Sequence, residues 1–392
     1  MSGNGAQHGG RLGGALLRPT DKAHPGHSRQ HNRALVLSSL FHTGPLSRAE
    51  LARTTGLTRV TISDLVSDLT GQGLIEDLGA STESRPGKPA NLIDIDSNGH
   101  VMAVLDLSDI ALARGALITL RGQVLAREEH PTQGATGPAM EKLALQLAEN
   151  LIQQTKSSKL LGVGVASPGV VTPEGVVVYA KDYQWTDFPL ADRMRTALLA
   201  PAYAANDANL RALAEFTYAG ASAEGLMEVS LTDGLGAGIL LDGALLMGPS
   251  SAAGEIGHIP AMVGGDPCTC GRRGCLETVL NRRVLAPAGS EPATQTAQSG
   301  ILPDAATLQR VGQSTAAVLA PIVSAFNLCD LVFADPKGVT TPPVLEAIRA
   351  GLEERLLPQI MADLDVRVSE LGADAALLGA GALVLAERLG LT

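Results

Sequence analysis

The sequence has few cysteines and few aromatic residues, and these shortages exclude several classes of protein. Only 4 of the 392 residues are cysteine, and aromatic residues make up 3% of the chain. So few cysteines argue against a disulfide-rich secreted domain and leave metal ligands or free thiols as their uses. The chain also lacks an apolar run that approaches the roughly 20 residues of a membrane-spanning helix. We therefore expect no membrane partner.

The first thirty residues lack the apolar stretch of a secretory leader and are instead rich in glycine and histidine. We interpret residues 1–30 as a disordered tail and expect a cytoplasmic protein. A chain of 392 residues exceeds one ordinary hydrophobic core, so two or three domains should follow the tail.

The net charge of −10 conceals an uneven distribution. Residues 1–93 contain 10 lysines and arginines against 7 acidic residues, a balance of +3, whereas the rest contains 20 against 33, a balance of −13. A small basic head on a large acidic body is typical of a protein whose head alone meets a polyanion. Charge by itself decides nothing here, because ordinary surface scatter can give the same balance.

Residues 31–96 have the pattern of a winged helix-turn-helix. Ser47 and Glu50 have the spacing of a capping box, which marks the start of a helix, and Gly56 supplies the turn that ends it. Thr58 can cap the helix that follows. The apolar residues of that second helix recur with the spacing of one buried face: Ile62, Leu65, Val66 and Leu69.

The outer face of the second helix offers groups that can contact DNA bases or phosphates. The residues we expect to bind DNA from this helix are Thr58, Arg59, Val60, Thr61 and Ser63. Two strands flank the segment SRPGKP (84–89), which predicts a wing whose tip carries Arg85 and Lys88 and fits a narrow minor groove. A plain helical hairpin is the alternative interpretation, and the wing disfavours it.

Beyond the head, strands and helices alternate, which indicates an α/β body. A body of this size should divide into two lobes with a ligand cleft between them. We expect the first lobe over 97–206 and the second over 207–379, with the C-terminal helix (380–392) packing back on the first. The stretch 286–300 has the composition of a flexible insertion, and we assign it no role.

Three of the four cysteines fall within eight residues: Cys268, Cys270 and Cys275. They could form a disulfide, a catalytic thiol or a metal site. A disulfide would leave one of them unpaired and would be reduced in the cytosol. His258, ten residues before Cys268, completes a Cys₃His set, which is typical of a closed structural zinc site. Cys329 lies in an apolar stretch and is expected in the core.

Three motifs of the body together resemble those of the ROK family of repressors and sugar kinases: NDAN (206–209), GEIGH (254–258) and CTCGRRGCLE (268–277). A winged head before such a body is similar to the repressor branch, which acts in xylose, N-acetylglucosamine and glucose metabolism. The resemblance covers residues 30–392. It implies two actin-like, ribonuclease-H-like lobes around a sugar cleft, a structural zinc loop, and a dimer or tetramer.

The resemblance also implies the residues of the sugar site. Family positions that bind the sugar match Asn206, Asp207, Glu255, His258 and Glu277, and the aspartate is the base of the kinases. Carboxylates and amides are suited to hydroxyl pairs, because they form charge-assisted hydrogen bonds with them. The family's zinc ligands match His258 and the three clustered cysteines.

The phosphate motifs of ROK kinases are altered in this chain. The turn Asp-x-Gly-Gly-Thr of the kinases is DLSDI (106–110) here, and the second phosphate loop reads TDGLG (232–236). Without the first pair of glycines, backbone N–H groups cannot approach phosphates closely. We also expect the carboxylates of Asp109 and Asp233 to repel them, so ATP should not bind.

The sequence therefore predicts a sugar-responsive DNA-binding regulator of carbohydrate metabolism, expected to be a repressor and to lack kinase activity. A homo-oligomer would place two recognition helices on a near-palindromic operator. One alternative is an active sugar kinase with a DNA-binding head, in which Asp207 is still the base. Another is a regulator controlled by a partner protein instead of a sugar.

Overall fold

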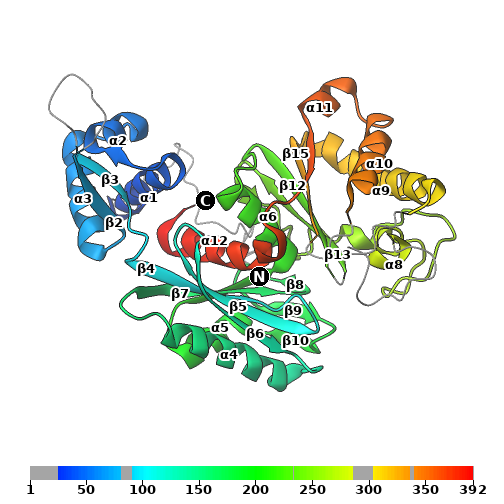
Figure 1. Cartoon of the computed structure of the whole chain (residues 1–392), viewed down its shortest axis with the longest axis horizontal. Helices are drawn as coiled ribbons and strands as arrows, with labels where there is room; N and C mark the ends of the chain where they lie inside the picture. The colour runs from blue at the N-terminus through cyan, green and yellow to red at the C-terminus, as the bar shows by residue number, and fades with distance from the viewer. Residues whose placement is uncertain (1–24, 81–90, 233, 286–302, 336–339, 392) are drawn as a thin grey trace, which may run out of the picture.

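The computed structural model describes residues 25–80, 91–232, 234–285, 303–335 and 340–391. A small head is joined to two larger lobes, each built on a five-stranded sheet (Figure 1). Within the described ranges, no helix is both long and apolar enough to cross a membrane. Asp233, the wing tip with Arg85 and Lys88, and the expected insertion at 286–300 lie outside these ranges.

The described residues of the head form three helices and a three-stranded antiparallel sheet of order β1-β3-β2. Its elements are α1 (Pro25–Thr43), β1 (Leu46–Ser47), α2 (Arg48–Thr55), α3 (Arg59–Gln72), β2 (Ile75–Ala80) and β3 (Asn91–Ile95). Helix α1 begins at Pro25, so the expected disordered tail does not extend to residue 30; the rest of that tail lies outside the described residues.

The local signals in the sequence account for the turn between α2 and α3. The predicted capping box is present, because the Ser47 hydroxyl accepts from the Glu50 N–H while the Glu50 carboxylate accepts from the Ser47 N–H. Gly56 ends α2 with φ of 71°, a left-handed conformation that glycine adopts without strain. Thr58 caps α3 as predicted, and the four apolar residues of its inner face are all buried.

The first lobe is built on a mixed sheet of order β11-β7-β4-β5-β6. Its strands are β4 (His100–Asp106), β5 (Leu112–Thr119), β6 (Val124–Pro131), β7 (Lys159–Ser167) and β11 (Ala202–Asn206). Helices α4 (Gly137–Gln153) and α5 (Leu190–Leu198) cover its outer face, as Figure 1 shows. A smaller sheet comprises β8 (Val170–Val171), β9 (Val177–Ala180) and β10 (Trp185–Phe188).

The second lobe is built on a mixed sheet of order β14-β13-β12-β15-β16. Its strands are β12 (Gly225–Leu231), β13 (Leu235–Leu241), β14 (Ala244–Leu245), β15 (Asp330–Ala334) and β16 (Asp365–Val368). The larger helices of this lobe are α9 (Ala305–Phe326), α10 (Pro342–Glu353) and α11 (Pro358–Asp363). The lobe also contains four short helical segments: η1 (Ile256–His258), α7 (Leu276–Val279), α8 (Arg282–Leu285) and η2 (Gly372–Asp374), the last of which directly precedes the final helix.

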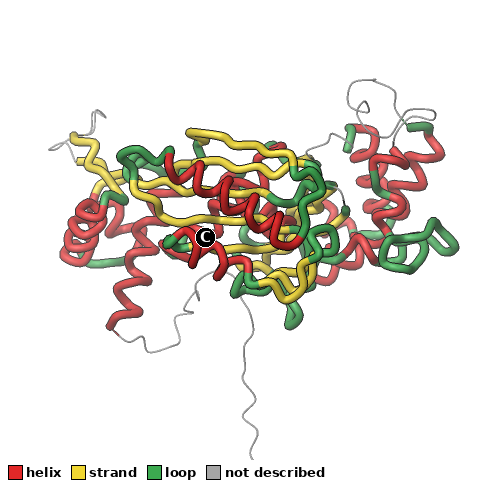
Figure 2. Tube along the Cα trace, turned by 90° about the horizontal axis from the view of Figure 1, so that it is seen from below, coloured by secondary structure: helices red, strands yellow, loops and turns green. Residues whose placement is uncertain are grey.

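Two helices fill the space between the sheets: α6 (Asp207–Tyr218) and α12 (Ala375–Leu389). Helix α12 packs on β4 and β7 of the first lobe, α6 packs on β12 and β13 of the second, and the two helices contact each other (Figure 1). Figure 2 shows helices lying against the strands in the middle of the molecule. Two glycines permit this close approach. A Cβ at Gly164 would lie 2.1 Å from the Ala380 carbonyl oxygen, and one at Gly379 would lie 1.9 Å from that of Leu210.

The buried apolar residues form three clusters, and one of them runs through both the head and the body. This cluster extends from Val36 in α1, through the core of the head, to Leu210 in α6 and Leu385 in α12. Each lobe has a further cluster beneath its outer helices. The predicted fold class, an α/β body with two sheet-based lobes behind a helix-turn-helix head, is confirmed.

Candidate functional site

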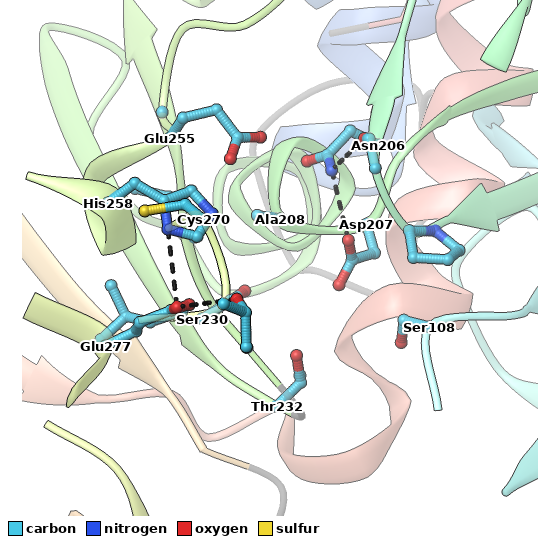
Figure 3. A pocket seen from close by; sticks show the side chains of 18 of the residues that line it. Ser108, Asn206, Asp207, Ala208, Ser230, Thr232, Glu255, His258, Cys270 and Glu277 are labelled. Atoms are coloured by element: carbon cyan, nitrogen blue, oxygen red, sulfur yellow. Dashed lines mark hydrogen bonds and ion pairs between the residues drawn. The ribbon is translucent and has the colours of Figure 1, made fainter. Parts of the chain in front are cut away.

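A cavity of about 950 Å³ opens between the two lobes. The first lobe contributes the ends of β4 and β11 and residues of β9, and the second contributes the β12–β13 connection and the loops around η1 and α7. All five residues expected in a sugar site line it: Asn206, Asp207, Glu255, His258 and Glu277. They converge from both lobes, as Figure 3 shows.

Asn206 is held in place by both ends of its amide. Its side-chain oxygen caps α6 by accepting from the Asn209 N–H at 3.1 Å, and its Nδ2 donates to the Gly169 carbonyl at 2.9 Å. The same Nδ2 lies 3.3 Å from Asp207 Oδ1. A side chain fixed on two sides presents its remaining polar surface to the cavity in one orientation, which suits the recognition of hydroxyl groups.

Asp207 begins α6 at the floor of the cavity and is 9% exposed. Burial raises the pKa of its carboxyl to about 6; the Arg211 guanidinium opposes this shift and the Asp106 charge adds to it. The carboxylate stands 3.6 Å from Arg211. Asp207 can therefore accept hydrogen bonds at neutral pH and can exchange a proton near pH 6.

On the opposite wall, Glu277 connects the cavity to the cysteine loop. Its Oε1 lies 3.5 Å from His258 Nδ1 and accepts from the Cys268 thiol at 2.7 Å. Glu255 projects into the open cavity from the loop before η1 (Figure 3). The pKa of Glu255 is raised, chiefly because the side chain is buried. His258 opposes this shift and the charge of Glu277 adds to it.

Beneath Asp207, a buried network occupies the turn that corresponds to the first phosphate motif. Asp106 is completely buried, and its Oδ1 accepts from the Ser108 N–H at 2.9 Å and from the Ser108 hydroxyl at 2.6 Å. Arg114 donates to its other oxygen, while Arg211 donates to Ser108 Oγ at 2.9 Å. Burial would raise the pKa of Asp106, but Arg211, Arg114 and Ser108 together lower it.

The structure corrects one part of the phosphate argument. We expected Asp109 to place its charge where a phosphate would lie. Among the described residues, the cavity lining from this turn includes Ser108 and Ile110 but not Asp109, and Asp109 Oδ1 accepts from the Ala111 N–H. From this turn, Ser108 and Ile110 therefore line the cavity and Asp109 does not. Asp233 cannot be placed, because it lies outside the described residues.

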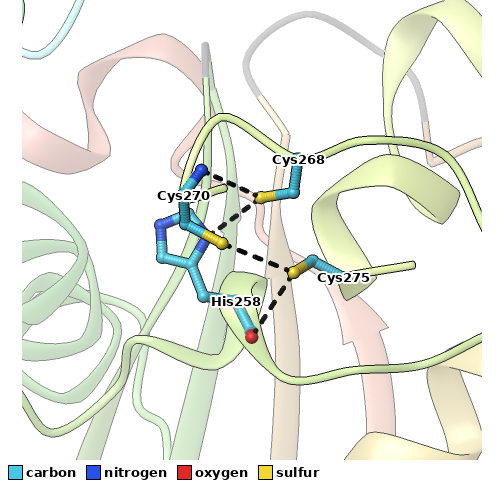
Figure 4. A group of neighbouring side chains, drawn as sticks. All are labelled: His258, Cys268, Cys270 and Cys275. Carbon is cyan, nitrogen blue, oxygen red and sulfur yellow. Dashed lines mark hydrogen bonds between the residues drawn. The ribbon is translucent and has the colours of Figure 1, made fainter. Parts of the chain in front are cut away.

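The four expected metal ligands form one cluster (Figure 4). The ligand atoms of His258, Cys268, Cys270 and Cys275 all lie within 4.8 Å of one another. The sulfurs of Cys270 and Cys275 are 3.7 Å apart, and Cys268 Sγ is 3.5 Å from His258 Nδ1. All four cysteines of the chain are free, so the cluster contains no disulfide.

This donor set fits zinc. Two sulfurs on a tetrahedral zinc lie about 3.8 Å apart, since each Zn–S bond is about 2.3 Å, and a sulfur and a nitrogen lie about 3.6 Å apart. The Cys270–Cys275 and Cys268–His258 separations of 3.7 and 3.5 Å match these two values, and every other pair of ligand atoms lies within 4.8 Å. The Arg272 side chain lowers the pKa of Cys270 to about 6, which favours its thiolate. Burial instead raises the pKa of Cys268 to about 12 and also raises that of Cys275.

The exposed start of α3 carries the residues expected to bind DNA. Thr58, Arg59, Val60 and Ser63 are exposed and Thr61 is half-buried; for Val60 the exposed fraction is 72%. Elsewhere in the head, Arg33 pairs with Asp68 and Arg48 with Asp77. Arg59 forms no ion pair within the described part of the chain and is available to a polyanion.

Sequence reasoning missed Arg211, the largest fully buried side chain of the described residues. Its Nη1 and Nε have no hydrogen-bond partner there, although it lies near three buried carboxyls: Asp106, Asp207 and Glu228. The sequence did offer one sign of this buried charge, because ANLRALAEF (208–216) places an arginine among apolar residues, one helical turn after Asp207. Tyr179 was also missed; it is 55% exposed and lines the cavity.

Two family models match different parts of the chain. The model described as "ROK family" matches residues 111–387, and the model of bacterial regulatory proteins of the crp family matches residues 45–75. The first range contains the whole sheet of the second lobe, the sheet of the first lobe except β4, and the residues that line the cavity except Ser108 and Ile110. The second contains the helix-turn-helix of the head.

Individual relatives include both regulators and enzymes. The chain is 25% identical to the xylose repressor of Bacillus spizizenii, over 90% of this chain and 94% of that protein. It is 31% identical to the glucokinase of Halalkalibacterium halodurans, over 69% of this chain and 90% of the enzyme. A ROK family transcriptional regulator described as a homologue of the E. coli MLC protein has the same fold, with a TM-score of 0.77, 24% identity, and coverage of 93% and 98% of the two chains.

Proposed function

Because the chain belongs to the ROK family and carries a helix-turn-helix head, we propose that it is a sugar-responsive transcriptional regulator, and specifically a repressor of carbohydrate genes. The observation that carries the proposal is a cavity lined by hydroxyl-binding side chains in the same molecule as an exposed recognition helix. The xylose repressor, similar along 90% of this chain, supports it. Such a regulator works on the chromosome, so we place it in the cytoplasm.

The effector in this proposal is a sugar or sugar derivative. Asn206, Asp207, Glu255 and Glu277 would bind its hydroxyl groups, and His258 would offer its Nε2. The His258 Nδ1 faces Cys268 and would bind zinc, so one ring would connect the sugar to the metal loop. Zinc itself would be structural, since three thiolates and one imidazole complete a tetrahedron and leave no position for water.

On the DNA side, two copies of the chain would place their α3 helices in successive major grooves of a near-palindromic operator. Arg59, Val60, Thr61 and Ser63 would reach base edges, and Thr58 would bind the backbone near the N-terminus of α3. Arg85 and Lys88 would approach the minor groove from the wing. A dimer or tetramer is part of this proposal, because operator symmetry requires symmetry in the protein.

We infer that this regulator lacks kinase activity. Asp106 and Ser108 bind each other and two arginines, so their polar groups are engaged within the protein. The turn also lacks the glycines that let backbone N–H groups reach a phosphate. An ATP-dependent sugar kinase with a DNA-binding head is the second candidate, favoured by the raised pKa of Asp207, about 6, and by the glucokinase relative.

Two experiments test the proposal. Thermal shift followed by calorimetry with D-xylose, D-glucose and N-acetyl-D-glucosamine should identify at least one sugar that binds. A duplex selected from a random library should then bind the protein with an affinity that this sugar changes. If sugars bind but never alter DNA affinity, the regulatory half of the proposal is wrong. ATP turnover that Asp207→Asn abolishes would instead establish the kinase.

A further inference from the structure

Helix α6 begins in the cavity and ends at the head. Its cap, Asn206, and its first residue, Asp207, line the cavity, whereas its last residue, Tyr218, contacts the head. Twelve residues at about 1.5 Å of rise each make a rod about 17 Å long. One rigid element therefore has its two ends at the two sites that a sugar-responsive regulator must connect (Figure 1).

The contact at the head end is formed by Tyr218, Phe41, Arg121 and Gly122, which we call the joint. The Tyr218 ring meets the Phe41 ring of α1 edge to face, with 6.0 Å between centroids. A Cβ at Gly122, in the β5–β6 turn, would lie 3.0 Å from Tyr218 Cε1, so the ring lies against that turn. Tyr218 is thus held between the first lobe and the first helix of the head.

Arg121 fastens the end of α1 to the same turn. Its guanidinium donates to the carbonyls of Phe41 at 3.0 Å and Leu40 at 3.2 Å, and it pairs with Asp94 in β3. It also lies over the Phe41 ring, 5.8 Å from the centroid. A cation at the carbonyl end of a helix is favourable. The joint therefore sets the direction in which α1 leaves the body.

The recognition helix is held by a second, separate attachment. His100, at the start of β4, has its Nδ1 2.9 Å from the carbonyl of Gly73, which caps α3. The Lys159 ammonium donates to the Gln72 carbonyl at 3.3 Å. Both contacts come from the first lobe. A shift at the joint would therefore turn the head about this attachment and change where α3 points.

Packing between the cavity and the joint is continuous. Leu210 and Leu213 of α6 belong to the same buried cluster as Val36 and Leu40 of α1, and Tyr218 and Phe216 pack against it. The α6 backbone touches that of α12 at Gly379, and the end of α12 touches α1, where a Cβ at Gly390 would lie 3.1 Å from Ala34 Cβ. Close-packed interiors have low compressibility, so a displacement at one end reaches the other.

We propose that α6 transmits occupancy of the sugar site to the DNA-binding head through the joint. This inference rests on the proposed function and specifies its route. Sugar hydroxyls bound by Asn206 and Asp207 at one end of α6 shift the helix. Tyr218 then moves against Phe41 and Gly122 and reorients the head. The sugar acts because it binds one of the two arrangements more tightly.

The test is a pair of variants at one position. Tyr218→Leu removes the edge-to-face contact, whereas Tyr218→Phe keeps the ring and removes a hydroxyl that has no hydrogen-bond partner among the described residues. The probes are a duplex selected from a random library and D-xylose, D-glucose or N-acetyl-D-glucosamine, whichever binds. Sugar affinity is measured by calorimetry, and DNA affinity by fluorescence anisotropy with and without sugar.

In wild type and in Tyr218→Phe, the sugar should change DNA affinity by about 5-fold or more, which is a typical allosteric coupling. In Tyr218→Leu the sugar should change DNA affinity by less than about 2-fold, while the affinity for the sugar itself is nearly unchanged. A Tyr218→Leu protein with wild-type coupling overturns the inference and leaves the proposed function standing. No sugar effect in wild type overturns the proposed function itself. If Tyr218→Leu fails to fold, Arg121→Gln decides on the same criteria, because Arg121 is partly exposed.

Discussion

At the scale of single residues, Asp207 connects the proposed sugar site to the buried charges beneath it. The carboxylate accepts hydroxyl hydrogen bonds only through its lone pairs, and protonation converts one oxygen into a donor. Since the pKa of Asp207 is raised by burial to about 6, this change falls close to neutral pH. The affinity for the sugar should therefore depend on pH through the protonation of this one residue.

We expect sugar affinity to decrease as the pH is lowered through about 6, because protonated Asp207 loses the charge that strengthens its hydrogen bonds. Asp207→Asn should bind the sugar about 10-fold to 100-fold more weakly, the value of a hydrogen bond to a charged group. Its affinity should also be independent of pH in this range. Calorimetry on both proteins between about pH 5 and pH 8 tests this expectation. An unchanged pH profile in the variant would assign the titration to another group.

The same substitution should make the protein more stable at neutral pH. The pKa of about 6 in the folded state exceeds the ordinary value of 3.8, so the folded state holds this proton more tightly. That stabilisation is complete below about pH 3.8 and is lost as the pH rises through about 6, a loss on the order of 3 kcal/mol. Urea unfolding of Asp207→Asn should show a gain at about pH 7.5 that disappears near pH 4. A loss at both pH values would mean that pairing with Arg211 outweighs desolvation.

Cys270→Ser should release zinc, since serine is a poor ligand and the remaining three residues cannot close the tetrahedron. Cys329→Ser is the matched control, because Cys329 lies in another part of the lobe with its sulfur near the Gly225 carbonyl. Metal analysis of the purified proteins should find zinc in wild type and in the control and a deficit in Cys270→Ser. Equal zinc content in all three would refute the proposed ligand set.

At the scale of elements, α3 and the wing should contribute differently to DNA binding. Arg59 stands at the start of α3, where base edges of a bound duplex would come within its reach. Arg59→Ala should cost about 1–3 kcal/mol on the selected duplex and much less on random DNA. Anisotropy titrations against both duplexes measure this difference. Equal losses on the two would show that Arg59 contacts phosphate and not bases.

Lys88→Ala provides the comparison for a residue expected to contact phosphate. Its loss should weaken binding to both duplexes alike and reduce the slope of affinity against salt concentration by about one unit. Titrations over a range of salt concentrations measure that slope. A variant with an unchanged slope would place Lys88 away from the DNA backbone.

The elements with local signals could be predicted from the sequence. The capping box at Ser47, the turn at Gly56 and the cap at Thr58 each depend on residues a few positions apart, and the structure confirms all three. The cysteine cluster is equally local, apart from His258. In these cases backbone geometry fixes which side chains meet, so spacing is sufficient.

The contacts that the sequence could not predict join residues far apart in the chain. Arg211 meets Ser108 across 103 positions, and Arg121 meets Phe41 across 80. No periodicity records such pairs, because they depend on how layers stack. Asp109 shows the converse error: its sequence position suggested a charge facing the cavity, but the turn directs its carboxylate to the Ala111 N–H. The sequence thus predicted five side chains that line the cavity, but not the network beneath them.

At the scale of the whole molecule, the head and the central layer share one hydrophobic cluster. Separating the head would break the contact of Phe41 with Tyr218 and that of α1 with the end of α12, so we expect no stage in which the head melts alone. Thermal unfolding followed by circular dichroism should coincide with the fluorescence of Trp185, the only tryptophan of the chain, which is buried in the first lobe. An earlier helical transition would show that the head unfolds independently.

If α6 connects a bound sugar at one end to the head at the other, as proposed, the coupling also acts in the opposite direction. Thermodynamic linkage requires the promoter to change the affinity for the sugar by the same factor by which the sugar changes the affinity for the promoter. Protein molecules bound to the promoter would thus respond at a different sugar concentration from molecules that are free of DNA. The number of binding sites in a genome, relative to the number of copies of this protein, would then help to set the dose at which the genes switch.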